Sequence, residues 1–115
     1  MPDLKLMKAD DVAEKEVAID GAEKVSIRWL ISKDDGAPNF SMRMFDISRG
    51  GHSPLHSHSW EHEVYIVEGE GKLIFEGEEK TFSAGDFIFV PGEKEHSFIN
   101  TGENRMRFLC LVPND

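Results

Sequence analysis

Four of the five histidines fall into two groups that could bind a metal ion. His56, His58 and His62 lie within the run HSHSWEH, and His96 lies within VPGEKEHSFIN. Imidazole is the commonest protein ligand for divalent transition metals, and an H-x-H pair in an extended chain places both rings on one side. The two groups therefore predict a metal site.

The parity of the residue numbers predicts which side chains of the first run face the metal. Residues at even offsets share one face of a strand, so the three imidazoles of the run converge if it stays extended, while Glu61 and Glu63 point away. A β-bulge between Ser59 and Glu61 would reverse this assignment on one side, which makes Glu63 the alternative ligand. His96 lies on a later predicted strand and could bring a fourth imidazole to the same point.

The elements that position these residues are predicted to be short strands. After about Glu16 no segment shows the apolar period of 3.6 residues that marks an amphipathic helix, and Gly or Pro interrupts most stretches long enough to form one. The segment from Lys5 to Val17 is compatible with a strand or a short helix. Turn residues such as Gly50-Gly51 and Pro91-Gly92 separate the candidate strands, and the even spacing favours an all-β jelly-roll barrel or sandwich. The predicted strands are Val25–Ile31, Phe40–Ile47, Glu63–Glu68, Lys72–Phe75, Lys80–Phe82, Asp86–Val90, His96–Asn100 and Met106–Val112.

Length and composition predict one acidic domain without a nucleic-acid or membrane partner. The 115 residues suffice for one core, with a barrel over residues 25–113 and an N-terminal segment over 1–24. A net charge of −9 repels phosphate backbones and anionic membranes. The charged start and the lack of a run of roughly 20 apolar residues indicate a cytoplasmic protein. Cys110 is the single cysteine, so a thiolate zinc-finger site is excluded and any metal must rest on nitrogen and oxygen.

The two histidine groups lie in segments that resemble the two motifs of the cupin superfamily. The first family motif, G-x5-H-x-H-x3,4-E-x6-G, matches from Gly50 through His56 and His58 to Gly69, and the second, G-x5-P-x-G-x2-H-x3-N, matches from Gly85 to Asn100. The resemblance implies a single-domain cupin barrel. The second motif departs from the family pattern, because Gly92 directly follows Pro91 and Glu93 takes the usual place of the glycine.

The resemblance implies a four-histidine ligand set, because His62 occupies the position where the family usually has its glutamate. The ligands would then be His56, His58, His62 and His96. Four neutral imidazoles leave the charge of the ion uncompensated, which makes it a stronger Lewis acid and a better host for an anion. The resemblance favours Mn or Fe, while Zn, Ni, Co and Cu suit imidazole equally well. A closed structural metal, or a surface cluster without an ion, are the alternatives.

Several residues near the ligands are candidates for the wall of a substrate pocket, each with a purely structural alternative. Arg43 interrupts an apolar run, where a buried cation would need a carboxylate or an anionic ligand; its alternative is a partner for a surface acid. Cys110 is either a small buried hydrophobe or, if it faces the metal, an oxidisable thiol. His52 is assigned to a solvated loop. The remaining candidates are the aromatic residues Phe45, Trp60, Phe98 and Phe108.

The resemblance favours a metal-dependent oxidoreductase of the dioxygenase type that acts on a small organic substrate. A non-catalytic module that binds or senses a metal or small molecule is the alternative. An isomerase would need proton-transfer groups at the pocket, and Tyr65, the single tyrosine, has the outward parity of Glu63. The resemblance also implies a homodimer, formed by exchange of Val25–Ile31 or the segment before it.

Overall fold

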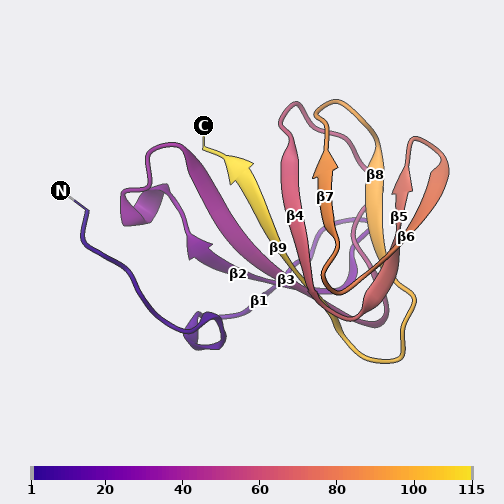
Figure 1. Ribbon diagram of the computed structural model, residues 1–115, viewed down its shortest axis with the longest axis horizontal. Helices are drawn as coiled ribbons and strands as arrows, with labels where there is room; N and C mark the ends of the chain where they lie inside the picture. Colours follow the sequence, from indigo (N-terminus) through magenta and orange to yellow (C-terminus); the bar gives the residue numbers. More distant parts are fainter. Residues whose placement is uncertain (1, 115) are drawn as a thin grey trace.

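The computed structural model describes residues 2–114, which form antiparallel strands joined by tight turns (Figure 1). Two 3-10 turns, η1 (Ala9–Asp11) and η2 (Lys33–Asp35), are its only helical segments within the described chain. No helix among these residues is long and apolar enough to cross a membrane. The strands are β1 (Lys15–Glu16), β2 (Glu23–Ile31), β3 (Phe40–His52), β4 (His62–Glu68), β5 (Glu70–Phe75), β6 (Glu78–Ser83), β7 (Phe87–Val90), β8 (His96–Asn100) and β9 (Met106–Pro113).

The strands form one curled sheet, which confirms the all-β prediction. Its order is β6-β5-β8-β3-β9-β4-β7, and β2 adds to β3 with β1 beside it. In Figure 1, β4 to β8 curl around one end, whereas β2, β3 and β9 run on as a long arm toward the N-terminal segment. Because β3 pairs with β2, β8 and β9, it links the arm to the curled end that holds the histidines.

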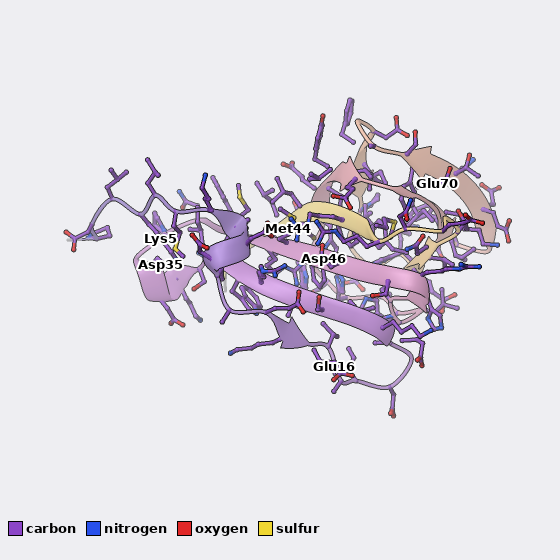
Figure 2. The ribbon with its side chains drawn as sticks, turned by 90° about the horizontal axis from the view of Figure 1, so that it is seen from below. Lys5, Glu16, Asp35, Met44, Asp46 and Glu70 are labelled. Atoms are coloured by element: carbon purple, nitrogen blue, oxygen red, sulfur yellow. The ribbon has the colours of Figure 1, made fainter. Side chains whose placement is uncertain are left out.

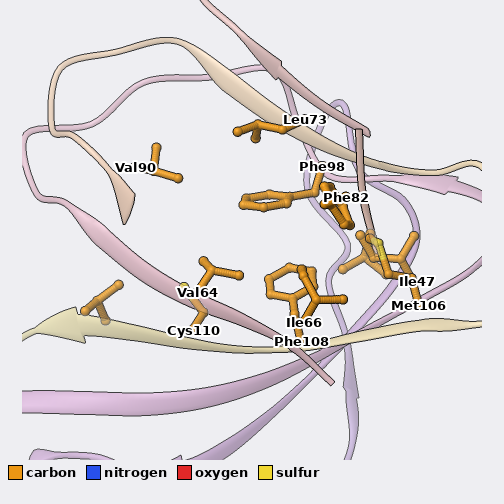
Figure 3. Packing of buried hydrophobic residues seen from close by; sticks show 12 residues of the cluster. Ile47, Val64, Ile66, Leu73, Phe82, Val90, Phe98, Met106, Phe108 and Cys110 are labelled. Carbon is orange, nitrogen blue, oxygen red and sulfur yellow. The ribbon is translucent and has the colours of Figure 1, made fainter. Parts of the chain in front are cut away.

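The alternation of side chains along β4 shows why the sheet curls around a core. His62, Val64 and Ile66 are buried, whereas Glu63 and Tyr65 between them are exposed. Period-two patterning of this kind places every second side chain on the inner face of a sheet. Figure 3 shows the inner side chains meeting across the curl. The core cluster contains Val25, Ile47, Val64, Ile66, Leu73, Phe82, Val90, Phe98, Met106, Phe108, Cys110 and Val112.

All eight predicted strands are present, but two details of the sequence-based prediction were wrong. Gly50-Gly51 is not a turn: β3 continues through it to His52, which pairs with Glu23 and Ile99. Gly50 has a φ of 79° and the β2–β3 register shifts beside it, so the glycines form an irregularity within a strand. His52, which was assigned to a solvated loop, is therefore the last residue of β3 and is half-buried. The N-terminal stretch, left open between a strand and a short helix, contains η1 and the two-residue β1.

A charged network holds the N-terminal segment against the outer face of the arm. Asp46 on β3 accepts two hydrogen bonds from Arg107, at 2.7 and 2.9 Å, and one from Arg28 at 3.0 Å. Arg107 also pairs with Asp10, and Arg28 with Glu14. Figure 2 shows the N-terminal segment on this side of the molecule, next to the strand on which Asp46 is labelled. The outer face of β3 therefore anchors the N-terminal segment, whereas Arg43 and Phe45 on its inner face line the cavity described below.

Candidate metal centre

Backbone pairing brings the two histidine groups together. His56 forms an isolated antiparallel bridge with His96, in which each backbone N–H donates to the other residue's carbonyl, at 3.1 and 2.9 Å. The convergence of the run HSHSWEH was predicted on the condition that the run stays extended, with a bulge between Ser59 and Glu61 as the alternative. The chain bends at Ser59 and Trp60 before β4 begins at His62. The three histidines of this run nevertheless converge, because the bridge fixes its start and β4 fixes its end.

The bend after His58 depends on the turn before His96. The Glu93 N–H donates to the His58 carbonyl at 2.7 Å. A Cβ atom on Gly92 would lie 2.4 Å from the Ser59 carbonyl oxygen, so this close approach requires glycine. Gly92, the glycine that departs from the second family motif, thus allows the segment before His96 to approach the segment after His58. Glu93 adopts the left-handed backbone conformation of this turn, with a φ of 66°.

The imidazoles of His56, His58 and His96 form a cluster with metal-ligand spacing. One ring nitrogen from each of the three lies within 4.8 Å of the others. The Nδ1 atom of His58 contacts the Trp60 carbonyl, and Nδ1 of His96 contacts the Lys94 carbonyl, both at 2.9 Å. If these Nδ1 atoms carry the proton, as such carbonyl contacts favour, Nε2 is left as the ligand atom. The donor set therefore fits a divalent transition metal.

His62 lies beside this cluster on the inner face of β4. Its Nε2 atom is 2.6 Å from Nε2 of His58, and its ring centroid is 5.3 Å from that of His96. Glu63, the alternative ligand, is exposed on the opposite face of the strand. His52 ends β3 and contacts the carbonyl of its neighbour Ser53.

The surroundings of His56, His58 and His62 lower the pKa values of these rings and so favour the neutral form, which is the form that binds a metal. Burial lowers the pKa of His62 to about 3, and the charge of Arg43 and the other histidines add to this effect. Burial, followed by the charges of neighbouring histidines, also lowers the pKa of His56. The pKa of His58 is lowered, mainly by burial. Protons therefore compete less well for these three rings than for a free imidazole.

The histidine rings face an apolar cavity of about 210 Å³ inside the curl. Every pocket candidate from the sequence lines it: Arg43, Phe45, Trp60, Phe98, Phe108 and Cys110. Trp60 stacks on His58 with ring centroids 4.3 Å apart, and Phe108 stacks between Phe45 and Phe98. The aromatic residues thus form an apolar wall next to the imidazoles.

Arg43 and Cys110 meet behind His62. They are directly opposite each other in the β3–β9 register. Arg43 Nη2 donates to Cys110 Sγ at 3.1 Å, and Sγ lies 2.8 Å from His62 Nδ1. Cys110 is buried, which raises the pKa of its thiol against the opposing effect of Arg43. The thiol therefore contacts a histidine of the site as well as packing in the core.

Sequence reasoning missed the wall that the N-terminal part of the chain contributes. Val17, Ile19, Val25 and Ile27 line the cavity, together with Ile47. Val17 and Ile19 follow β1, in the N-terminal segment that was left open between a strand and a short helix. Their alternation with Ala18 was the available signal, although it is too short to define a strand.

These features define a cupin. The model of the Cupin_2 family, described as cupin domain, matches residues 43–112, which is more than half of the chain. The chain therefore belongs to the cupin family, and its fold is the predicted cupin barrel. The match includes Arg43, all four histidines and Cys110.

Solved structures and curated proteins give more specific similarities. The polyketide cyclase RemF from Streptomyces resistomycificus is 33% identical, with a TM-score of 0.91, over 97% of this chain and 80% of that one. The oxalate-binding protein of Thermotoga maritima is 32% identical over 96 residues, which is 80% of this chain and 78% of the relative.

A third relative is matched over a smaller part of its length. It is the 1-methylthio-D-xylulose 5-phosphate methylsulfurylase of Rhodospirillum rubrum, 31% identical over 71 residues. The match covers 62% of this chain, which spans 46% of the relative. The names of these three similar proteins thus describe three different functions.

Proposed function

We propose that this cupin is a metal-dependent enzyme that acts on a small organic substrate. The observation that carries the proposal is the convergence of histidine rings from two distant segments of the chain on one end of an apolar cavity. A cluster serving only structure would have no need of an adjoining cavity lined by stacked aromatic rings. The cavity is below the roughly 300–1,000 Å³ typical of ligand pockets, which favours a small substrate.

We propose His56, His58, His62 and His96 as the ligands of the ion. The 2.6 Å contact between His58 and His62 supports the inclusion of His62 with the other three. Imidazole nitrogens suit several divalent ions, and we favour Mn or Fe from the family resemblance. A metal bound here would supply Lewis acidity and, for a redox-active ion, electron transfer to oxygen. The protein would hold the rings of His56, His58 and His62 neutral, orient the ligands and exclude water with its apolar wall.

We propose dioxygenase-like oxidation as the first candidate reaction, on the basis of the family resemblance. A redox-neutral reaction is the second candidate, because the similarity to a polyketide cyclase extends over nearly the whole chain. Non-catalytic binding is the third, since another relative is an oxalate-binding protein. The exposed position of Tyr65 gives no support to a tyrosine-assisted isomerase.

Metal analysis and electron paramagnetic resonance test this proposal. Protein purified without added metal is expected to contain about one Mn or Fe per chain, and its spectrum is expected to change when peroxide is added. A diamagnetic zinc site that does not respond to added ligands would contradict the oxidation reaction. Such a result would leave the redox-neutral reaction to be tested by product analysis.

We also propose a homodimer. β2 pairs with β3 of its own chain, so the segment before β1 is the better candidate for exchange. In that segment Leu4 and Leu6 are 91% and 86% exposed, and Phe87 on β7 is 83% exposed. Exposed apolar side chains of this kind favour coverage by a second copy. Light scattering is expected to give a dimer mass, whereas a monomer mass at micromolar concentration would contradict the proposal.

A further inference from the structure

Arg43 is shielded from solvent but has no carboxylate partner, whereas the other shielded arginines, Arg28 and Arg107, each form ion pairs. Arg28 and Arg107 pair with Asp46, and Arg105 pairs with Glu68. Arg49 is exposed at the surface. Within residues 2–114, no carboxylate forms an ion pair with Arg43, although the residue is half-buried and its Nε atom is fully buried. A buried guanidinium without an anion is energetically unfavourable.

The contacts of Arg43 leave its hydrogen-bonding capacity unfilled. Its Nη2 donates to the Cys110 thiol, a weak acceptor, and lies 3.3 Å from His62 Nδ1. If His62 binds a metal through Nε2, its Nδ1 carries the proton and accepts nothing from Arg43. The Nε atom is buried and, among the described residues, has no hydrogen-bond partner. The rings of Trp29 and Phe45, 5.5 and 4.9 Å from the guanidinium carbon, stabilise the charge but offer no oxygen acceptor.

The position of Arg43 makes a bound anion the missing partner. Arg43 lines the same cavity as the four histidines, and among the described residues that line it, Arg43 alone carries a full charge. Neutral imidazoles leave the charge of a metal uncompensated, so the ion and the guanidinium would stand together in an apolar environment. An anionic group in the cavity would compensate both charges and accept hydrogen bonds from Arg43.

The other side chains of the cavity indicate the size and polarity of the part of the ligand that carries the anionic group. Phe45, Phe98 and Phe108 form a stacked series, with adjacent ring centroids 5.2 and 4.8 Å apart. We propose that Arg43 is the anion-binding residue of the cavity and that its ligand is a small organic acid with an apolar, ring-sized body. The proposal rests on the proposed function for the identity of the site, but the contact with Arg43 does not require the metal.

Calorimetry on chelator-treated, metal-free protein with benzoate and benzamide tests this proposal. The two probes share their ring and shape, and only benzoate is charged. Because a charge-assisted hydrogen bond is stronger than a neutral one, benzoate is expected to bind at least about tenfold more tightly. Arg43→Met should abolish this preference, Arg43→Lys should retain part of it, and Arg49→Met, which removes the same charge from the surface, should retain all of it. Thermal unfolding of each variant verifies that it is folded.

Equal affinities of the wild-type protein for the two probes, no measurable benzoate binding, or an unchanged preference in Arg43→Met would each overturn the proposal. Metal binding by the same variants is measured separately. A chain that binds metal but shows no Arg43-dependent preference retains the proposed function and loses the anion site. A chain that shows the preference but binds no metal gives the reverse result.

Discussion

The Sγ atom of Cys110 lies 2.8 Å from the Nδ1 atom of His62, so a core thiol contacts the imidazole that faces His58. The contact allows the sulfur to accept a hydrogen bond from the Nδ1–H group of His62, which leaves Nε2 free on the side of the cluster. Cys110 is in this view a positioning residue for His62, held in place by Arg43.

Replacement of Cys110 tests this role. Cys110→Val keeps an apolar side chain of similar size but removes the sulfur, and it is expected to weaken metal binding by about 10–100-fold, as outer partners of metal ligands do. Cys110→Ser keeps a hydrogen-bonding atom and should recover most of the affinity. Competition with a chromogenic chelator measures both. Equal affinities of the Val variant and the wild type would show that the contact is packing alone.

Gly92→Ala is expected to disturb both stability and the site. The added Cβ would lie 2.4 Å from the Ser59 carbonyl, so the segments that carry His58 and His96 must separate. We expect a loss of about 1–3 kcal/mol in the free energy of unfolding, as for overpacked sites, together with weaker metal binding. Urea unfolding measures the first effect. Gly102→Ala is the control, because its nearest neighbour is the flexible side chain of Glu70 and it should change little.

The metal-free protein is expected to lose stability as the pH falls below 6.5. Burial and the charge of Arg43 lower the pKa of His62 from 6.5 to about 3 in the folded state. A group with a lowered folded pKa contributes its full stability above its unfolded pKa and loses it as the pH falls toward the folded value. Unfolding midpoints measured from pH 7 to pH 4 should therefore decrease. His62→Gln should show a smaller decrease, whereas an identical slope would contradict the assignment.

Asp46→Asn is expected to reduce stability without changing the metal site. Burial opposes ionisation of Asp46, but hydrogen bonds and charges from Arg107, Arg105 and Arg28 prevail, so its pKa is lowered below 3.8. Removal of this charge leaves Arg107 buried without its main partner, at a cost of about 3–5 kcal/mol. Chemical unfolding measures the loss. Because the network lies on the outer face of β3, metal content per folded chain should equal that of the wild type.

The sequence allowed the prediction of the strands and of the inward direction of His62, because both follow from period-two patterning. It did not allow the prediction that Arg43 meets Cys110, since that contact depends on the register between β3 and β9, which lie far apart in the sequence. Gly50-Gly51 was taken for a turn because glycine pairs occur in turns and in strand irregularities alike. The role of Gly92 depends on a backbone approach from Ser59 that no local pattern records.

We propose that His62, and not Glu63, completes the metal site. Single His62→Ala and Glu63→Ala variants, purified without added metal, are compared with the wild type by elemental analysis. His62→Ala is expected to lose most of its metal, and Glu63→Ala is expected to retain the content of the wild type. Metal retained by His62→Ala and lost by Glu63→Ala would contradict it.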